Sequence, residues 1–156
     1  MNYTDIYFIS RISNKNFDVN SSYKKEYIDN ILTSKKPSGL ETKSALVFKK
    51  NDNRAIITIT TTIKFVLPVE GKELIKSSFA TEFHILNSDL IFSGLHQESA
   101  NFMGHLFFVA QTNAQGIFAN ELERKKLPVV PIQFVPMDSY KQTLMDFLNA
   151  HHGDRI

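Results

Sequence analysis

The side chains that could bind a metal or transfer protons in this chain are chiefly its five histidines. They are His84, His96, His105, His151 and His152. A zinc site on a helix needs a second His or a carboxylate four residues away, and His105 has only Asn101 and Val109 at that spacing. Cysteine is absent, which excludes disulfides, thiolate metal sites and thiol nucleophiles. We therefore predict no metal site and no cofactor.

Signatures of catalysis are also missing from the sequence. It contains no G-x-S-x-G elbow, no phosphate-binding P-loop and no G-x-G-x-x-G motif. The nearest pair of carboxylates in the helical half, Glu121 and Glu123, would point to different sides of a helix. The sequence therefore favours a binding protein over an enzyme, and a catalytic site assembled from distant residues is the alternative.

Apolar and aromatic side chains are the remaining candidates for function. The chain has 13 Phe and no Trp, and Phe buries a large area without needing a hydrogen-bond partner. We predict a groove that binds unfolded, apolar polypeptide with little sequence specificity, whereas a place in the core is the alternative for each Phe. The candidate client-binding residues are Tyr7, Phe17, Tyr23, Tyr27, Phe134, Tyr140, Leu144 and Phe147.

The first half of the chain reads as strands that would support these residues. Alternating apolar and polar residues predict four strands separated by short turns, which indicates an antiparallel meander. The β-branched third segment has a Thr-rich side that we expect to be lightly covered, and residues 21–39 could form a helix or a loop. The predicted strands are Thr4–Ile12, prolonged to Val19 beyond a kink at Asn14–Asn16, then Thr42–Phe48, Arg54–Leu67 and Leu74–Leu86.

The second half reads as helices packed on one face of that sheet. Helical spacing over residues 98–126 presents two apolar stripes, which implies two packing partners. One partner would be the sheet, and the other would be the same helix of a second subunit, through Phe107, Ala110, Ala114, Phe118 and Leu122. Prolines keep the following link extended before a short C-terminal helix. The sequence thus predicts one α+β domain over residues 1–156, with a sheet half at 1–86 and a helical half at 98–150.

Charge and targeting signals indicate where this domain is located and which partners it binds. The net charge is +2, and the basic residues gather between Tyr23 and Arg54, where protection of strand edges by Lys is a better explanation than nucleic-acid binding. Residues 1–10 lack the features of a signal peptide, and no apolar run approaches the ~20 residues of a membrane span. We therefore expect a cytoplasmic protein with no membrane span and no nucleic-acid partner.

The order of several segments resembles SecB, the bacterial protein-export chaperone, over nearly the whole chain. Phe8–Ile12 followed by Asn16–Asp18 is similar to the first strand of that family, and Ile56–Leu67 is similar to its alternating third strand. Phe79–Phe83 resembles its fourth strand, which carries an acidic residue in the middle. Leu127–Phe134 resembles its Pro-containing link between a basic helix end and an aromatic short helix.

This resemblance implies a four-stranded antiparallel sheet, and dimers that pair into a homotetramer. It also implies an ATP-independent holdase for unfolded or nascent polypeptides in protein export and transport. Asp18 and Glu82 could take the acidic positions that the family offers to the motor ATPase SecA. The basic net charge and the short tail after Ala150 depart from the family, so a dedicated client such as an antitoxin of a toxin–antitoxin pair is the natural variant. The alternatives are an adaptor with one folded partner, or a nucleic-acid or small-ligand module on the Thr-rich face.

Overall fold

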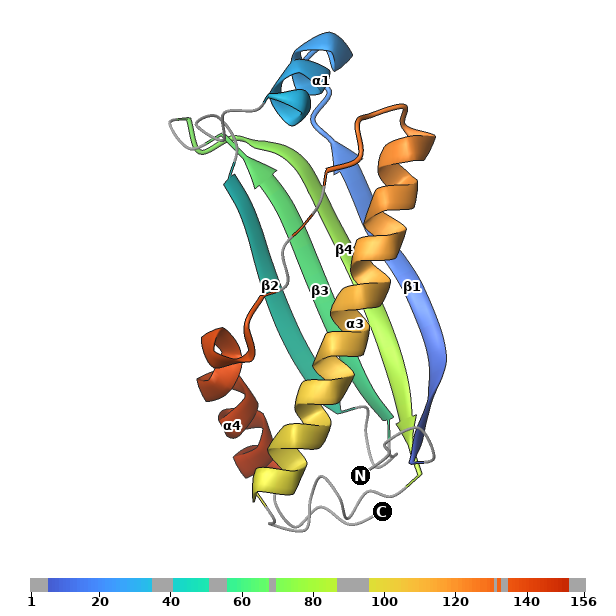
Figure 1. Ribbon diagram of the computed structural model, residues 1–156, viewed down its shortest axis with the longest axis vertical. Helices are drawn as coiled ribbons and strands as arrows, with labels where there is room; N and C mark the ends of the chain where they lie inside the picture. The colour runs from blue at the N-terminus through green and yellow to red at the C-terminus, as the bar shows by residue number, and fades with distance from the viewer. Residues whose placement is uncertain are drawn as a thin grey trace.

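A computed structural model gives the architecture as one antiparallel sheet with helices on one face (Figure 1). The elements are β1 (Tyr7–Val19), α1 (Lys25–Thr33), β2 (Glu41–Lys50), β3 (Ile56–Val66), β4 (Glu73–Ile85), α3 (His96–Arg124), the 3-10 helix η3 (Met137–Tyr140) and α4 (Lys141–Ala150). The structure describes residues 6–34, 41–50, 56–67, 70–86, 96–130, 132 and 135–151. The predicted α+β class, with a long helix and a short C-terminal helix, is confirmed.

The four strands lie in the order β1-β4-β3-β2, and every neighbouring pair is antiparallel. The predicted meander therefore holds for the last three strands, but β1 lies beside β4 rather than beside β2. A tight hairpin between β1 and β2 would need only a few residues, whereas here residues 20–40, including α1, separate them. The long connection carries the chain to the opposite edge of the sheet, which leaves β1 and β2 as the two edge strands.

Two irregularities in β1 decide which of its side chains face the helices. Its register against β4 shifts between Ile9 and Arg11 and again between Asn14 and Asn16, so that the predicted kink is confirmed. Such bulges re-aim the side chains that follow them. As a result Tyr7 and Phe17 lie on the helix side, whereas Arg11, opposite Glu82, lies on the face turned away from α3, which we call the outer face.

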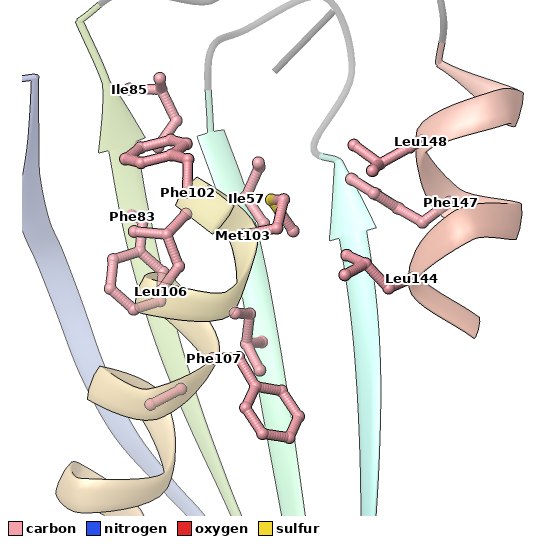
Figure 2. Packing of buried hydrophobic residues seen from close by; sticks show 12 residues of the cluster. Ile57, Phe83, Ile85, Phe102, Met103, Leu106, Phe107, Leu144, Phe147 and Leu148 are labelled. Carbon is pink, nitrogen blue, oxygen red and sulfur yellow. The ribbon is translucent and has the colours of Figure 1, made fainter. Parts of the chain in front are cut away.

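The core lies between the sheet and α3. Apolar residues alternate along β3 and β4 and are buried, while the intervening Thr residues of β3 on the outer face are half-exposed, as the sequence predicts. One cluster joins β3, β4 and the first half of α3 to α4, whose Leu144, Phe147 and Leu148 point toward α3 (Figure 2). The other cluster joins the opposite end of the sheet to α1 and the last turns of α3, around Phe118.

The link after α3 folds back along the helix because glutamine side chains hold it. Gln111 accepts a hydrogen bond of 2.8 Å from the backbone N–H of Val135 and donates one of 3.2 Å to its carbonyl. Gln115 donates a further bond of 2.8 Å to the carbonyl of Ile132. These side-chain hydrogen bonds take the place of backbone pairing with a strand. They direct the link back along α3, so that α4 lies beside the first turns of that helix.

Helix α3 ends in a tight C-terminal turn that is stabilised by two backbone bonds. Lys126 has a φ of 55°, and its N–H donates to the carbonyl of Glu123 at 2.9 Å. The N–H of Leu127 donates to the carbonyl of Leu122, also at 2.9 Å. This is the Schellman arrangement, in which glycine is the usual residue at the left-handed position. Lysine at that position therefore carries a conformational cost.

Candidate functional site

A groove opens between the first turns of α3 and the η3–α4 segment. It has a volume of about 390 Å³. Its lining is apolar at the centre and polar at the rim, and we call it the C-terminal groove. The lining residues are Ala100, Asn101, Gly104, Met137, Asp138, Lys141 and Leu144. These residues come from segments more than thirty positions apart, so that only the folded chain forms the groove.

The groove exists because two small or flexible residues meet at its centre. A Cβ atom added to Gly104 would lie 3.6 Å from the Met137 methyl carbon. The absence of a side chain at Gly104 therefore leaves space on the helix beneath the Met137 thioether. Methionine adapts its shape to different apolar partners. Asp138 and Lys141 at the rim are exposed, and they can hydrogen-bond to an extended backbone. The groove is thus suited to an apolar side chain of an extended polypeptide.

Three of the predicted client-binding residues lie beside or beneath this groove. Tyr140 is half-buried and packs on Phe107, with ring centroids 5.5 Å apart. Leu144 and Phe147 are only 3% and 8% exposed, because the apolar side of α4 faces the core. Phe147 therefore anchors α4, Leu144 lines the groove as well as the core, and their predicted role in client binding stays a prediction.

Tyr7 ties the edge strand to the long helix instead of forming open surface. Its ring contacts Phe83, Phe102 and His105 at centroid distances of 5.6, 6.1 and 5.5 Å. A hydrogen bond of 2.9 Å joins its hydroxyl to Nε2 of His105. Burial raises the pKa of the Tyr7 hydroxyl and lowers the pKa of His105. Both shifts favour the neutral forms of the two groups, and the contact gives His105 a structural place between β1 and α3.

A second aromatic surface lies at the opposite end of the sheet, at α1. Tyr23 and Tyr27 stack with centroids 5.3 Å apart and planes 13° from parallel, and Tyr27 is 43% exposed. The Tyr23 hydroxyl donates to Glu70 Oε2 at 3.3 Å, which steadies the pair. Phe17 is half-buried against Phe118 at 5.5 Å. This Tyr23–Tyr27 pair is an accessible flat apolar surface.

The seven predicted client-binding residues that the structure describes thus divide between two ends of the molecule and do not form one continuous groove. Phe134 lies outside the described residues. Sequence reasoning missed Ala100, Gly104 and Met137, because small and flexible residues carry no signal of a groove until two helices cross. A glycine in the middle of a long helical pattern was the available hint, since it marks a place where another segment comes close.

The residues predicted to join two subunits lie in the core of the single chain. Each of Phe107, Ala110, Ala114, Phe118 and Leu122 is 2% exposed or less. Phe118, for example, is surrounded by the rings of Phe17, Phe65 and Phe79 at 5.5, 5.4 and 6.3 Å. These five side chains therefore pack within the single chain, whereas the sequence predicts that they contact a second subunit. On α3 the large apolar side chain that is exposed is Phe108, at 55%.

The two acidic residues predicted to contact SecA lie on the outer face opposite basic residues. Asp18 pairs in register with Lys76, and Glu82 pairs with Arg11. The Glu82 carboxylate also accepts a hydrogen bond of 2.9 Å from the Ser10 hydroxyl. Neither residue therefore lies in a predominantly acidic surface.

Two further expectations concern metal sites and membrane spans. Within the described ranges, no group of three His, Cys, Asp or Glu side chains is placed to hold a metal ion. Of the helices in those ranges, none is both long and apolar enough to cross a membrane.

Comparisons with known proteins give a similarity of fold. No family model and no curated protein matches the chain. Among solved structures it is similar to the SecB-like chaperone Rv1957 of Mycobacterium tuberculosis, in complex with a ChAD peptide from the HigA1 antitoxin. That similarity has a TM-score of 0.50 and 11% identity, and covers 85% of this chain and 89% of the other. A protein of unknown function from Streptococcus agalactiae is similar at a TM-score of 0.34 and 14% identity, over 82% and 93% of the two chains. At 11% identity the first similarity shows the α+β fold alone.

Proposed function

We propose that this protein is a SecB-like holdase that binds extended apolar polypeptide without ATP and without catalysis. The observation that carries the proposal is the C-terminal groove, where Met137 and Gly104 leave about 390 Å³ beside a polar rim. The shared fold with a SecB-like chaperone solved with an antitoxin peptide supports it. In this proposal the groove accepts unfolded apolar polypeptide with little sequence specificity, and the physiological client is a dedicated one, such as an antitoxin, in the bacterial cytoplasm.

The two apolar surfaces fit a client that binds in extended form. Gly104 at the groove and Phe118, which packs on Phe17 near the Tyr23–Tyr27 pair, are separated by about 21 Å of helix at 1.5 Å per residue. An extended chain covers that span with about six residues. Each buried apolar side chain contributes about 1.5–3 kcal/mol, so about three to six must bind together to reach the ~8 kcal/mol of a micromolar complex.

The surface residues of the sheet bear on two further proposals, namely whether the protein docks to SecA and whether it forms oligomers. Because Asp18 and Glu82 face Lys76 and Arg11, we favour a dedicated client over docking to SecA in general export. We also propose that the chain forms dimers, or dimers of dimers. The exposed apolar residues of edge strand β1 support this, namely Phe8, Ile9 and Ile12, which are 38–47% exposed.

The test is suppression of aggregation of two unrelated, chemically unfolded proteins by titrated chain in the absence of nucleotide. Gly104→Leu should fill the C-terminal groove and raise several-fold the amount of chain needed for protection. Gly116→Leu is the matched control on the same helix, because a Cβ there meets nothing within 4 Å.

Three outcomes would decide the proposal. Protection by similar amounts of the wild type and Gly116→Leu, with a several-fold larger amount of Gly104→Leu required, supports it. Equal protection by the two variants would show that the client binds elsewhere. No protection by folded wild-type chain would leave a dedicated adaptor as the better function.

A further inference from the structure

The outer face of the sheet carries a hollow that the holdase proposal does not use. One row of residues crosses all four strands in register beside it: Arg11 of β1, Glu82 of β4, Thr58 of β3 and Lys49 of β2. The hollow has a volume of about 340 Å³ and lies on the side of the sheet opposite α3. It is therefore separate from the C-terminal groove.

The hollow forms because short side chains follow long ones along the strands. Ala80 of β4 is 3% exposed and lies opposite Ser13 of β1, and both line the hollow. The long side chains of Arg11, Lys49 and Glu82 rise beside this low floor, and Lys15 of β1 completes the lining. The result is a shallow polar basin with cations at its rim.

The charge of the basin is positive. Its lining holds the three cations Arg11, Lys15 and Lys49 and the single carboxylate Glu82. The Glu82 carboxylate already accepts a hydrogen bond from Ser10. Among the described residues the ion pairs lie elsewhere, so that no described carboxylate approaches these three cations within 4 Å. Arg11 lies opposite Glu82 in register but forms no ion pair with it. Exposed cations that are not held in an ion pair are available to an external anion.

We propose that this basin is a docking site for an acidic segment of a partner polypeptide, whose Asp or Glu side chains bind Arg11, Lys15 and Lys49. Arginine offers a planar fork that matches a carboxylate with two parallel hydrogen bonds. The volume of about 340 Å³ accommodates side chains rather than a folded surface. The same face would repel a basic partner. The resemblance to SecB implies instead that Asp18 and Glu82 offer acidic positions to a partner, so the charge expected of the partner is reversed.

The outer face fits a polypeptide better than a nucleic acid. A nucleic acid would need a continuous basic track with free aromatic rings for base stacking. Farther along this face Lys64 is already paired with Glu73 at 2.6 Å, and Asp18 is exposed. The exposed ring of Phe8 stacks on His84 at 4.8 Å, so that one of its faces is occupied.

The test uses a labelled ten-residue Glu-rich peptide and fluorescence anisotropy at low and high salt. The double variant Arg11→Gln/Lys49→Gln should weaken binding about 2- to 30-fold, the range expected from two exposed ion pairs. The matched control Lys24→Gln/Lys125→Gln removes the same charge from two exposed positions outside the basin, and it should change binding far less. Glu82→Gln should strengthen binding by removing the one opposing charge.

The outcomes separate this site from its competitors and from the holdase proposal. Equal losses in the two double variants, or no binding by the wild type, would overturn the proposal. A single-stranded oligonucleotide that binds more tightly than the peptide, and is lost in the basin variant, would contradict the polypeptide assignment. Gly104→Leu should leave peptide binding intact, so that failure of the groove does not imply failure of the basin.

Discussion

Replacing Phe118 with alanine should destabilise the single folded chain by about 3–5 kcal/mol, the usual cost of removing a buried aromatic ring. The ring is 1% exposed and meets three other rings, those of Phe17, Phe65 and Phe79, at 5.5, 5.4 and 6.3 Å. Each such aromatic pair contributes about 0.5–1.5 kcal/mol beyond its buried area. Because a domain is stabilised by only about 5–15 kcal/mol, this single change should remove a large share of the total.

The assay is urea unfolding of wild type, Phe118→Ala and Phe118→Leu, followed by circular dichroism at two protein concentrations. Phe118→Leu retains most of the apolar volume and should lose about 1–3 kcal/mol, so that a measurement remains available if the alanine variant does not fold. A core residue affects the free energy of unfolding equally at both concentrations. An interface residue gives a loss that depends on concentration, because association contributes to its stability.

Phe108→Ala is the matched control, since it makes the same change on the same helix at a side chain that is 55% exposed. Its free energy of unfolding should stay within about 0.5 kcal/mol of wild type, as for most surface substitutions. The reasoning would be refuted by unchanged stability of Phe118→Ala together with a smaller mass in light scattering. That result would return Phe118 to the subunit contact that the sequence predicts.

Two further predictions concern the end of α3 and the contact between β1 and α3. Lys126→Gly should raise the free energy of unfolding by about 0.5–1 kcal/mol in the same urea assay, because Lys126 has a φ of 55° and glycine adopts that conformation without a Cβ clash. A decrease would show that the lysine side chain makes a contact that outweighs the strain. His105 has a pKa below its ordinary value of 6.5 because it is buried. The unfolded chain therefore binds more protons below about pH 6.5, so that stability should fall as pH drops through that region. His105→Gln should flatten this part of the stability profile, and an unchanged profile would contradict the assignment.

The four strands, and the buried faces of β3 and β4, follow from local pattern. In β3 the β-branched residues alternate with a period of two, and that period alone separates Ile57 and Ile63 in the core from Thr58 and Thr62 on the outer face. The kink at Asn14–Asn16 was equally visible, because polar residues interrupt the alternation there. The order of the strands was not predictable in this way, since pairing of β1 with β4 depends on the long connection that passes through α1.

The candidate site was only partly accessible to sequence reasoning. Aromatic side chains such as Tyr27 can be recognised as potential binding residues, but the sequence does not distinguish them from Phe147, which α4 buries. The residues at the centre of the C-terminal groove, Gly104 and Met137, have no composition signal. They acquire a role when the link folds back along α3 and places them 3.6 Å apart, counted from the position of an added Cβ.

The amino-acid pattern by itself determined the four strands, the long helix, the short C-terminal helix and the buried sides of β3 and β4, because these depend on residues two to four positions apart. It left residues 21–39 open between a helix and a loop. Tertiary packing decided which partner covers each side of α3. Two apolar stripes look alike in sequence whether the chain's own sheet or a second subunit covers them. Here the sheet, α4 and the link cover both, because α4 and the described part of the link, which Gln111 and Gln115 hold at Val135 and Ile132, return along the helix and leave Phe107 and Phe118 buried within one chain.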